Sequence, residues 1–224
     1  MLEQRLEKWS RIYSILLLLS LIVFVWTDQM QWIGFATITS FLLLFVLHYD
    51  DWKANSIWIG GVANWVTLFR LLLLIVLIWE YLNLSLSQLA MLGSVVMILD
   101  GLDGFLARRF KVASAFGAYF DMETDAFYVF LYACLLYQLE LLGWWILGIG
   151  ALRYVYVVFV LSFFKPKEKE EKSSFRGKAI AVFLMVSLLM PFILSELYYL
   201  PIVISASVLV VYSFAAGFLE TIRG

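Results

Sequence analysis

The sequence is organised around residues 100–125, which read DGLDGFLARRFKVASAFGAYFDMETD. Four aspartates lie in this stretch, although 64% of the whole chain is hydrophobic. On a helix, Asp100 and Asp103 are three residues apart and therefore share one face. Asp121 and Asp125 share a face in the same way, at a spacing of four. The stretch therefore predicts a helical hairpin whose two acidic faces can meet.

Four carboxylates in so apolar a chain need a strong compensating charge, because moving each of them out of water is costly. Oxygen ligands of this kind bind hard divalent cations, so the pattern indicates Mg²⁺ or Mn²⁺. Two such ions would balance the four negative charges. The alternative is that the aspartates form ion pairs with basic residues at the end of the first helix and in the connection, which are Arg108, Arg109 and Lys111.

The composition predicts an all-α integral membrane protein. The mean hydropathy of the 224 residues is +0.93, and a soluble domain is usually only about 45–50% apolar. Because a span needs about 20 apolar residues, we expect eight transmembrane helices. They are residues 12–26, 32–49, 62–82, 87–110, 115–137, 142–164, 179–195 and 201–219. Pro191 should kink the seventh of them.

The chain divides into three predicted parts. Residues 1–49 hold two N-terminal transmembrane helices. Residues 50–61 are too short and polar to cross a membrane, and their tryptophans favour an interfacial amphipathic helix. Residues 62–224 form a six-helix core that contains the four aspartates.

The distribution of basic residues predicts the orientation. With eight spans, every connection that contains Lys or Arg lies on one side of the membrane. The other four connections carry only the acids Asp28, Glu80, Glu140 and Glu196. Both termini and the turn between the fourth and fifth spans should therefore be cytoplasmic. The aspartates would lie roughly 15 Å inside the membrane from that side, lining a water-filled cavity.

The complete motif, Asp-x2-Asp-Gly-x2-Ala-Arg-x8-Gly-x3-Asp-x3-Asp, resembles the signature of the class I CDP-alcohol phosphotransferases, membrane enzymes of phospholipid synthesis. The start of the third span, Asn64-x2-Thr67, is similar to the first core helix of that family. The resemblance covers about residues 50–220, so the first two spans would be an addition to the family's six-helix core. The residues that meet the motif are Asp100, Asp103, Gly104, Ala107, Arg108, Gly117, Asp121 and Asp125.

The resemblance implies a reaction in which a CDP-linked alcohol, most often CDP-diacylglycerol, reacts with a second alcohol and releases CMP. It implies that Asp100, Asp103 and Asp121 hold two divalent metal ions. Asp125 would be a ligand to one of them and the general base. The residues implied in binding the CDP donor are Asn64, Thr67, Gly104, Arg108, Ser114 and Gly117.

The acceptor is a small alcohol that the motif does not name. Glycerol phosphate, inositol phosphate, serine and another phospholipid are the candidates. Arg153 could bind the phosphate of such an acceptor together with Lys178, or it could form an ion pair within the helix bundle. Lys178 could equally be an ordinary cytoplasmic charge. Membrane lipid is an expected partner, a homodimer is common in the family, and no nucleic-acid partner is expected.

Two other functions fit part of the pattern. The same motif would serve an aminoalcohol phosphotransferase, which uses a soluble CDP-alcohol as donor and diacylglycerol as acceptor. Carboxylates inside a membrane are also typical of metal or proton transporters. Against a transporter, the sequence contains no evident inverted repeat.

Overall fold

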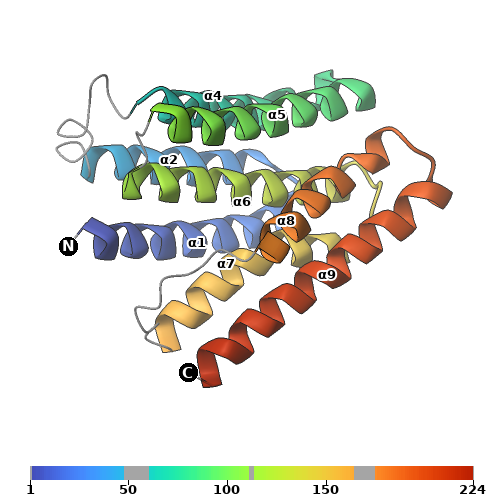
Figure 1. The fold of residues 1–224 in the computed structure, drawn as a ribbon. Coiled ribbons are helices and arrows are strands. Elements are labelled where there is room, and N and C mark those ends of the chain that lie inside the picture. Colours follow the sequence, from blue (N-terminus) through green and yellow to red (C-terminus); the bar gives the residue numbers. More distant parts are fainter. Residues whose placement is uncertain (1, 48–60, 111–113, 164–174, 224) are drawn as a thin grey trace. The chain divides into compact units, whose positions relative to one another are not determined.

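The computed structural model describes residues 2–47, 61–110, 114–163 and 175–223; for some residues in these ranges, 103–110 among them, it describes only the backbone. The described residues form helices and no strand (Figure 1). The α-helices are α1 (Leu2–Thr27), α2 (Gln31–Leu47), α4 (Gly61–Glu80), α5 (Leu86–Phe110), α6 (Ala115–Gln138), α7 (Trp145–Phe163), α8 (Phe175–Ser187) and α9 (Glu196–Arg223). Two short 3₁₀ helices, η1 (Tyr81–Asn83) and η2 (Met190–Phe192), follow α4 and α8.

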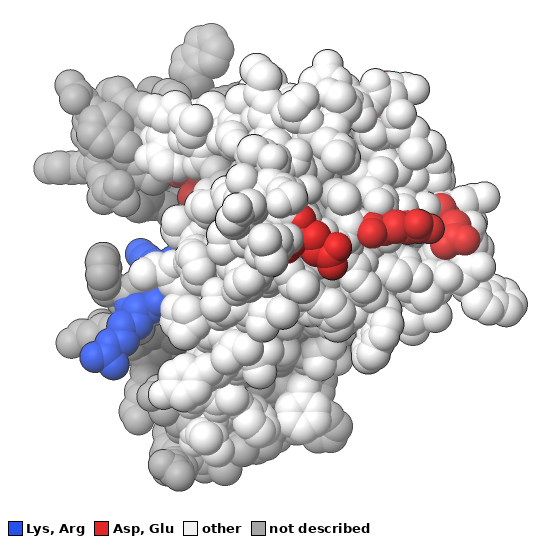
Figure 2. Space-filling view, turned by 90° about the vertical axis from the view of Figure 1, so that its right-hand side faces the viewer, with Lys and Arg blue, Asp and Glu red and all other residues white. Residues whose placement is uncertain are grey.

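The helices have the length and surface of a membrane protein. Within the described ranges, three segments are long and apolar enough to cross a membrane: Glu3–Thr27, Ala63–Asn83 and Glu196–Leu219. Three shorter helical segments, Gln31–Leu47, Leu86–Leu102 and Trp145–Val160, are also apolar. Most of the described surface visible in Figure 2 carries no charged side chain. The protein is therefore an all-α membrane protein, as predicted, while the number of eight spans stays a prediction.

Several predicted spans coincide with helices. Residues 62–82, 87–110 and 115–137 agree with α4, α5 and α6 to within a few residues. By contrast, α1 begins ten residues before the predicted first span. The charged N-terminal segment continues the helix, because it buries Leu6 and Trp9 on the same face as the later core residues. The predicted interfacial helix at 50–61 falls almost entirely outside the described residues.

The predicted kink at Pro191 is wrong. The α-helix ends at Ser187, and Pro191 lies in η2, which is separated from α8 by a turn. Proline has no backbone N–H, and its ring clashes with the preceding turn of an α-helix, so the chain stops the helix here instead of bending it. The last helix then begins at Glu196, earlier than the predicted span at 201–219.

The chain divides into two compact units, Met1–Tyr128 and Val129–Gly224, and α6 contributes to both. In the first unit, α1 packs on α2, α2 on α4, and α4 on α5. The Trp9 indole donates a hydrogen bond of 2.8 Å to the Ser40 carbonyl, which joins α1 to α2. A Cβ added to Gly34 would lie 2.5 Å from the Trp79 ring, so this glycine allows α2 and α4 to approach closely.

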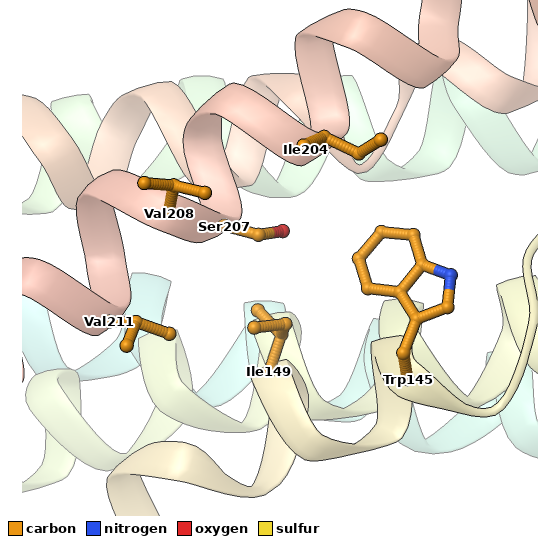
Figure 3. Close-up of a pocket in the computed structure, with 6 residues that line it drawn as sticks. All are labelled: Trp145, Ile149, Ile204, Ser207, Val208 and Val211. Carbon is orange, nitrogen blue, oxygen red and sulfur yellow. The ribbon is translucent and has the colours of Figure 1, made fainter.

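In the second unit, α9 packs against α7 and α8. The Tyr199 hydroxyl donates a hydrogen bond of 2.8 Å to the Leu141 carbonyl, which ties α9 to the connection between α6 and α7. A groove of about 290 Å³ lies between α7 and α9 (Figure 3). Its lining residues include no ionisable group, so they offer no acid or base for catalysis. Its lining residues are Trp145, Ile149, Ile204, Ser207, Val208 and Val211.

Candidate active site

Charged residues on three helices of the first unit lie at about the same distance from one end of the helix bundle. Arg70 lies nine residues after the start of α4, and Asp100 lies ten residues before the end of α5. Asp125 lies ten residues after the start of α6. At 1.5 Å per residue, each is about 14–15 Å from its helix end. These three ends belong to the same side, because short connections join α4 to α5 and α5 to α6.

Arg70 is the centre of the resulting cluster. Its side chain is fully buried, while the side chains of the three aspartates around it are 29–39% exposed. Its Nη1 lies 3.1 Å from Asp100 Oδ1 and 2.8 Å from Asp121 Oδ1. Its Nη2 donates a hydrogen bond to Asp125 Oδ1. One guanidinium group thus joins three helices through ion pairs with three carboxylates.

The cluster has the donor set that a divalent metal needs. One carboxylate oxygen from each of Asp100, Asp121 and Asp125 can be chosen so that all three lie within 4.8 Å of one another. Three carboxylates and one guanidinium leave a formal charge of −2, which a divalent cation would neutralise. Carboxylate oxygens are also the ligands that Mg²⁺ and Mn²⁺ prefer. The residues present therefore fit the predicted metal.

Three predicted site residues share α5 with Asp100, but the structure describes only their backbone and not their side chains. They are Asp103, Gly104 and Arg108. On a helix, Asp103 follows Asp100 by less than one turn, so it belongs to the same face. Its role as a metal ligand stays a prediction, as do the roles of Gly104 and Arg108 in donor binding.

The structure brings three of the predicted donor-binding residues together. A Cβ added to Gly117 would lie 2.6 Å from Asn64 Oδ1 and 3.2 Å from Ser114 Oγ. Ser114 precedes α6 and accepts a hydrogen bond of 3.0 Å from the Gly117 N–H, so it caps the helix. The absence of a side chain at Gly117 therefore lets the Asn64 side chain of α4 lie close to the start of α6. Thr67 is more deeply placed: it is buried, and its hydroxyl donates to the Ala63 carbonyl.

The two predicted acceptor residues belong to the second unit. Arg153 is half-buried on α7, and Lys178 is exposed on α8. Their role in binding the acceptor stays a prediction.

Glu123 points away from the aspartate cluster, as its position two residues off the acidic face predicts. It is fully buried, and its Oε1 accepts a hydrogen bond of 2.6 Å from the Ser10 hydroxyl of α1. Its link to the N-terminal helix is a contact that sequence reasoning did not identify.

Sequence reasoning also missed the role of Arg70. The spacing places it on one face of its helix with Asn64 and Thr67, but the alternative to metal binding considered ion pairs of the aspartates only with Arg108, Arg109 and Lys111. The side chains of those three residues lie outside the described part of the chain, whereas Arg70 pairs with three aspartates. Arg70 lies eight residues from the start of the predicted span 62–82, and Asp100 lies ten residues from the end of the predicted span 87–110. This similar depth is the signal that could have identified Arg70.

The fold and the cluster together define a helical membrane protein with an acidic site of the kind that serves metal-dependent chemistry. The chain belongs to the CDP-alcohol phosphatidyltransferase family, whose model matches residues 61–217. The predicted resemblance is therefore confirmed over α4 to α9. No curated protein and no solved structure matches the chain.

The family makes the protein a transferase of lipid biosynthesis that moves a phosphatidyl group from a CDP-alcohol to an alcohol acceptor. The match begins at residue 61, so α1 and α2 precede the family region. The family uses divalent metal ions, and the three described aspartates fit one.

Proposed function

We propose that the protein transfers the phosphatidyl group of CDP-diacylglycerol to a small alcohol and releases CMP. The observation that carries this proposal is the convergence of Asp100, Asp121 and Asp125 around a buried arginine in the family region. Such a cluster suits a reaction that moves a highly charged diphosphate, because phosphoryl transfer depends on neutralising the developing charge.

Asp100, Asp103, Asp121 and Asp125 are the proposed ligands of two Mg²⁺ or Mn²⁺ ions. When bound, the ions would neutralise charge on the donor diphosphate and on the leaving phosphate. Four carboxylates and the Arg70 guanidinium carry a formal charge of −3, which two divalent ions would change to +1. The loaded site would therefore attract the negatively charged donor.

The cytidine diphosphate of the donor is proposed to bind beside Asn64, Ser114 and Gly117. The absence of a side chain at Gly117 lets Asn64 and Ser114 lie close together, and both offer hydrogen-bonding groups. Arg108 would present its planar fork of N–H donors to a phosphate. Gly104 and Thr67 complete the proposed donor site.

Asp125 is the proposed general base. It would take the proton from the acceptor hydroxyl, whose oxygen then attacks the phosphorus that carries the diacylglycerol. A bond forms between that oxygen and that phosphorus, and the bond between the same phosphorus and the bridging oxygen of the diphosphate breaks. The bridging oxygen leaves with CMP, and the product is a phosphodiester lipid.

Arg153 and Lys178 are the proposed partners of a phosphate on the acceptor, and their test is which acceptors the enzyme accepts. We propose that the site opens to the cytoplasm, which follows from the positive-inside distribution of Lys and Arg.

The proposal is tested with purified protein in mixed micelles that contain CDP-diacylglycerol, Mg²⁺ and one acceptor at a time. The measurement is CMP release, together with the mass of the lipid product. We expect CMP release with at least one phosphorylated or hydroxylated acceptor, and its loss in EDTA. Product formation only from CDP-choline or CDP-ethanolamine and diacylglycerol would overturn the choice of donor. Activity that persists in EDTA would overturn the role of the metal ions.

A further inference from the structure

The catalytic helix α6 has a polar residue on the side opposite its aspartates. At 100° per residue, Asp121 and Asp125 lie 40° apart around the helix axis, and Glu123 lies about 180° from their midpoint. This residue is fully buried. A carboxyl group is rarely buried without a hydrogen-bond partner, because its desolvation is costly. The position therefore needs a specific contact on the back of α6.

That contact comes from α1. The Ser10 hydroxyl donates a hydrogen bond of 2.6 Å to Glu123 Oε1, across 113 residues of sequence, and both side chains are buried. This length lies within the usual range for O–H···O hydrogen bonds, and loss of either partner would leave a buried polar group without this bond.

The second N-terminal helix also contacts the back of α6, through aromatic rings. The ring centroids of Phe41 and Phe120 are 5.7 Å apart, and Phe45 lies 6.2 Å from Phe116 and 5.7 Å from Phe120. These contacts are apolar and shared among several rings, so they resist separation of the helices but tolerate small rotations. The Ser10–Glu123 hydrogen bond, by contrast, is directional.

We propose that Ser10 and Glu123 are positioning residues, through which the N-terminal helix pair sets the rotation of α6 and hence the aim of Asp121 and Asp125 at the metal site. The inference rests on the proposed function and assigns a role in the active site to α1, which precedes the matched family region. Neither Ser10 nor Glu123 touches the reacting groups.

The geometry makes the effect large enough to measure. Carboxylate oxygens lie roughly 5 Å from the axis of their helix, so a rotation of about 10° moves them by about 0.9 Å. Displacements near 1 Å at a catalytic centre can cost about 100-fold in rate. Loss of a residue that orients metal ligands typically weakens metal binding by about 10- to 100-fold.

The test measures Mn²⁺ binding directly, by the electron paramagnetic resonance signal of the free ion, in the purified full-length protein without any substrate. Ser10→Ala removes the hydroxyl and should weaken Mn²⁺ binding about tenfold. Glu123→Gln keeps an oxygen that can accept from Ser10, so it should lose less affinity than Glu123→Ala. The double variant Ser10→Ala/Glu123→Gln should bind no more weakly than Ser10→Ala, because the two residues act through one bond.

Ser14→Ala is the matched control. Ser14 is a buried serine one turn further along α1, and the hydrogen bond its hydroxyl donates goes to the Ser10 carbonyl of its own helix. The Ser14→Ala protein should bind Mn²⁺ like the unaltered protein. Equal affinities for Ser10→Ala and Ser14→Ala would overturn the inference, as would a loss of affinity that merely follows the thermal unfolding temperature across all variants. If the unaltered protein binds no Mn²⁺, the proposed function fails instead.

Discussion

Arg70 is the residue on which the candidate site depends. A fully buried guanidinium is stable only with compensating charge, and here three carboxylates from two other helices provide it. The carboxylates in turn depend on the arginine, because three carboxylates that meet inside a helical bundle would repel one another without a cation. Arg70 therefore holds together the groups that are proposed to receive metal ions.

Replacement of Arg70 by methionine should destabilise the protein when no metal is present. Met has a similar length but no charge, and removing one partner of a buried ion pair costs about 3 kcal/mol. Addition of Mn²⁺ should recover part of this loss, because the ion replaces the missing cation. The measurement is thermal unfolding by tryptophan fluorescence in EDTA and in Mn²⁺.

The control for Arg70→Met is Arg5→Met, which makes the same change at an exposed position on α1. It should unfold like the unaltered protein in both conditions. An Arg70→Met variant that unfolds at the unaltered temperature in EDTA would show that the ion pairs do not stabilise the cluster.

Asp125→Asn should stop CMP release almost completely while the protein stays folded. Asparagine keeps an oxygen that can accept the hydrogen bond from Arg70, but its amide cannot take a proton from the acceptor hydroxyl. We expect a loss of at least about 100-fold in rate, within the range for removal of a general base. CMP release and thermal unfolding are measured together.

Asp28→Asn is the matched control for that variant. It makes the same chemical change in the connection between α1 and α2, where the backbone has a φ of 55°. Asparagine tolerates this left-handed conformation, so neither activity nor stability should change. Full turnover by Asp125→Asn would remove the assignment of the base.

At the scale of the helices, close packing depends on positions without a side chain. Gly150 of α7 faces α6, and an added Cβ would lie 2.6 Å from Ala133 Cβ and 3.3 Å from Phe130 Cα. Both neighbours are at or next to the backbone, so neither can rotate away. Gly148, two residues earlier on the same helix, has no neighbouring atom within 4 Å of an added Cβ.

Gly150→Ala should therefore lower the free energy of unfolding by about 1–3 kcal/mol, the usual cost of overpacking a filled interior. Gly148→Ala should be neutral or stabilise by up to about 1 kcal/mol, because alanine favours helix more than glycine. Thermal unfolding of the two variants in detergent distinguishes them. Equal stability of the two variants would contradict the close approach of α6 and α7.

At the scale of the whole molecule, the distribution of Lys and Arg predicts the orientation in the membrane. The charge distribution predicts a cytoplasmic N-terminus and places the connection before α9 on the opposite side. Cys134 is the single cysteine and is buried, so Cys134→Ala provides a background for labelling. In that background we compare Glu3→Cys with Glu196→Cys, both at exposed helix positions.

A membrane-impermeant maleimide applied to intact cells should label the Glu196→Cys protein. It should label the Glu3→Cys protein only after the membrane is opened. The physical reason is the excess of Lys and Arg in the connections predicted to be cytoplasmic. Labelling of both positions in intact cells would contradict both the span number and the orientation.

The sequence alone was enough to predict the helical membrane fold, the positions of most helices, the family, and the helix faces on which Asp100, Asp121 and Asp125 lie. These follow from local properties: apolar runs of membrane length, and a motif whose spacing places carboxylates on helix faces. The end of α8 before Pro191 was not predicted, because proline can either bend or end a helix, and the surrounding packing decides between the two.

Tertiary structure decided which residues meet those faces. Arg70 and Asp121 are 51 residues apart, and Ser10 and Glu123 are 113 apart. Spacing along one helix shows which way a side chain points but not which helix lies opposite it. The buried arginine at the centre of the aspartates and the serine behind α6 are both contacts between helices, and only the packing of the bundle determines them.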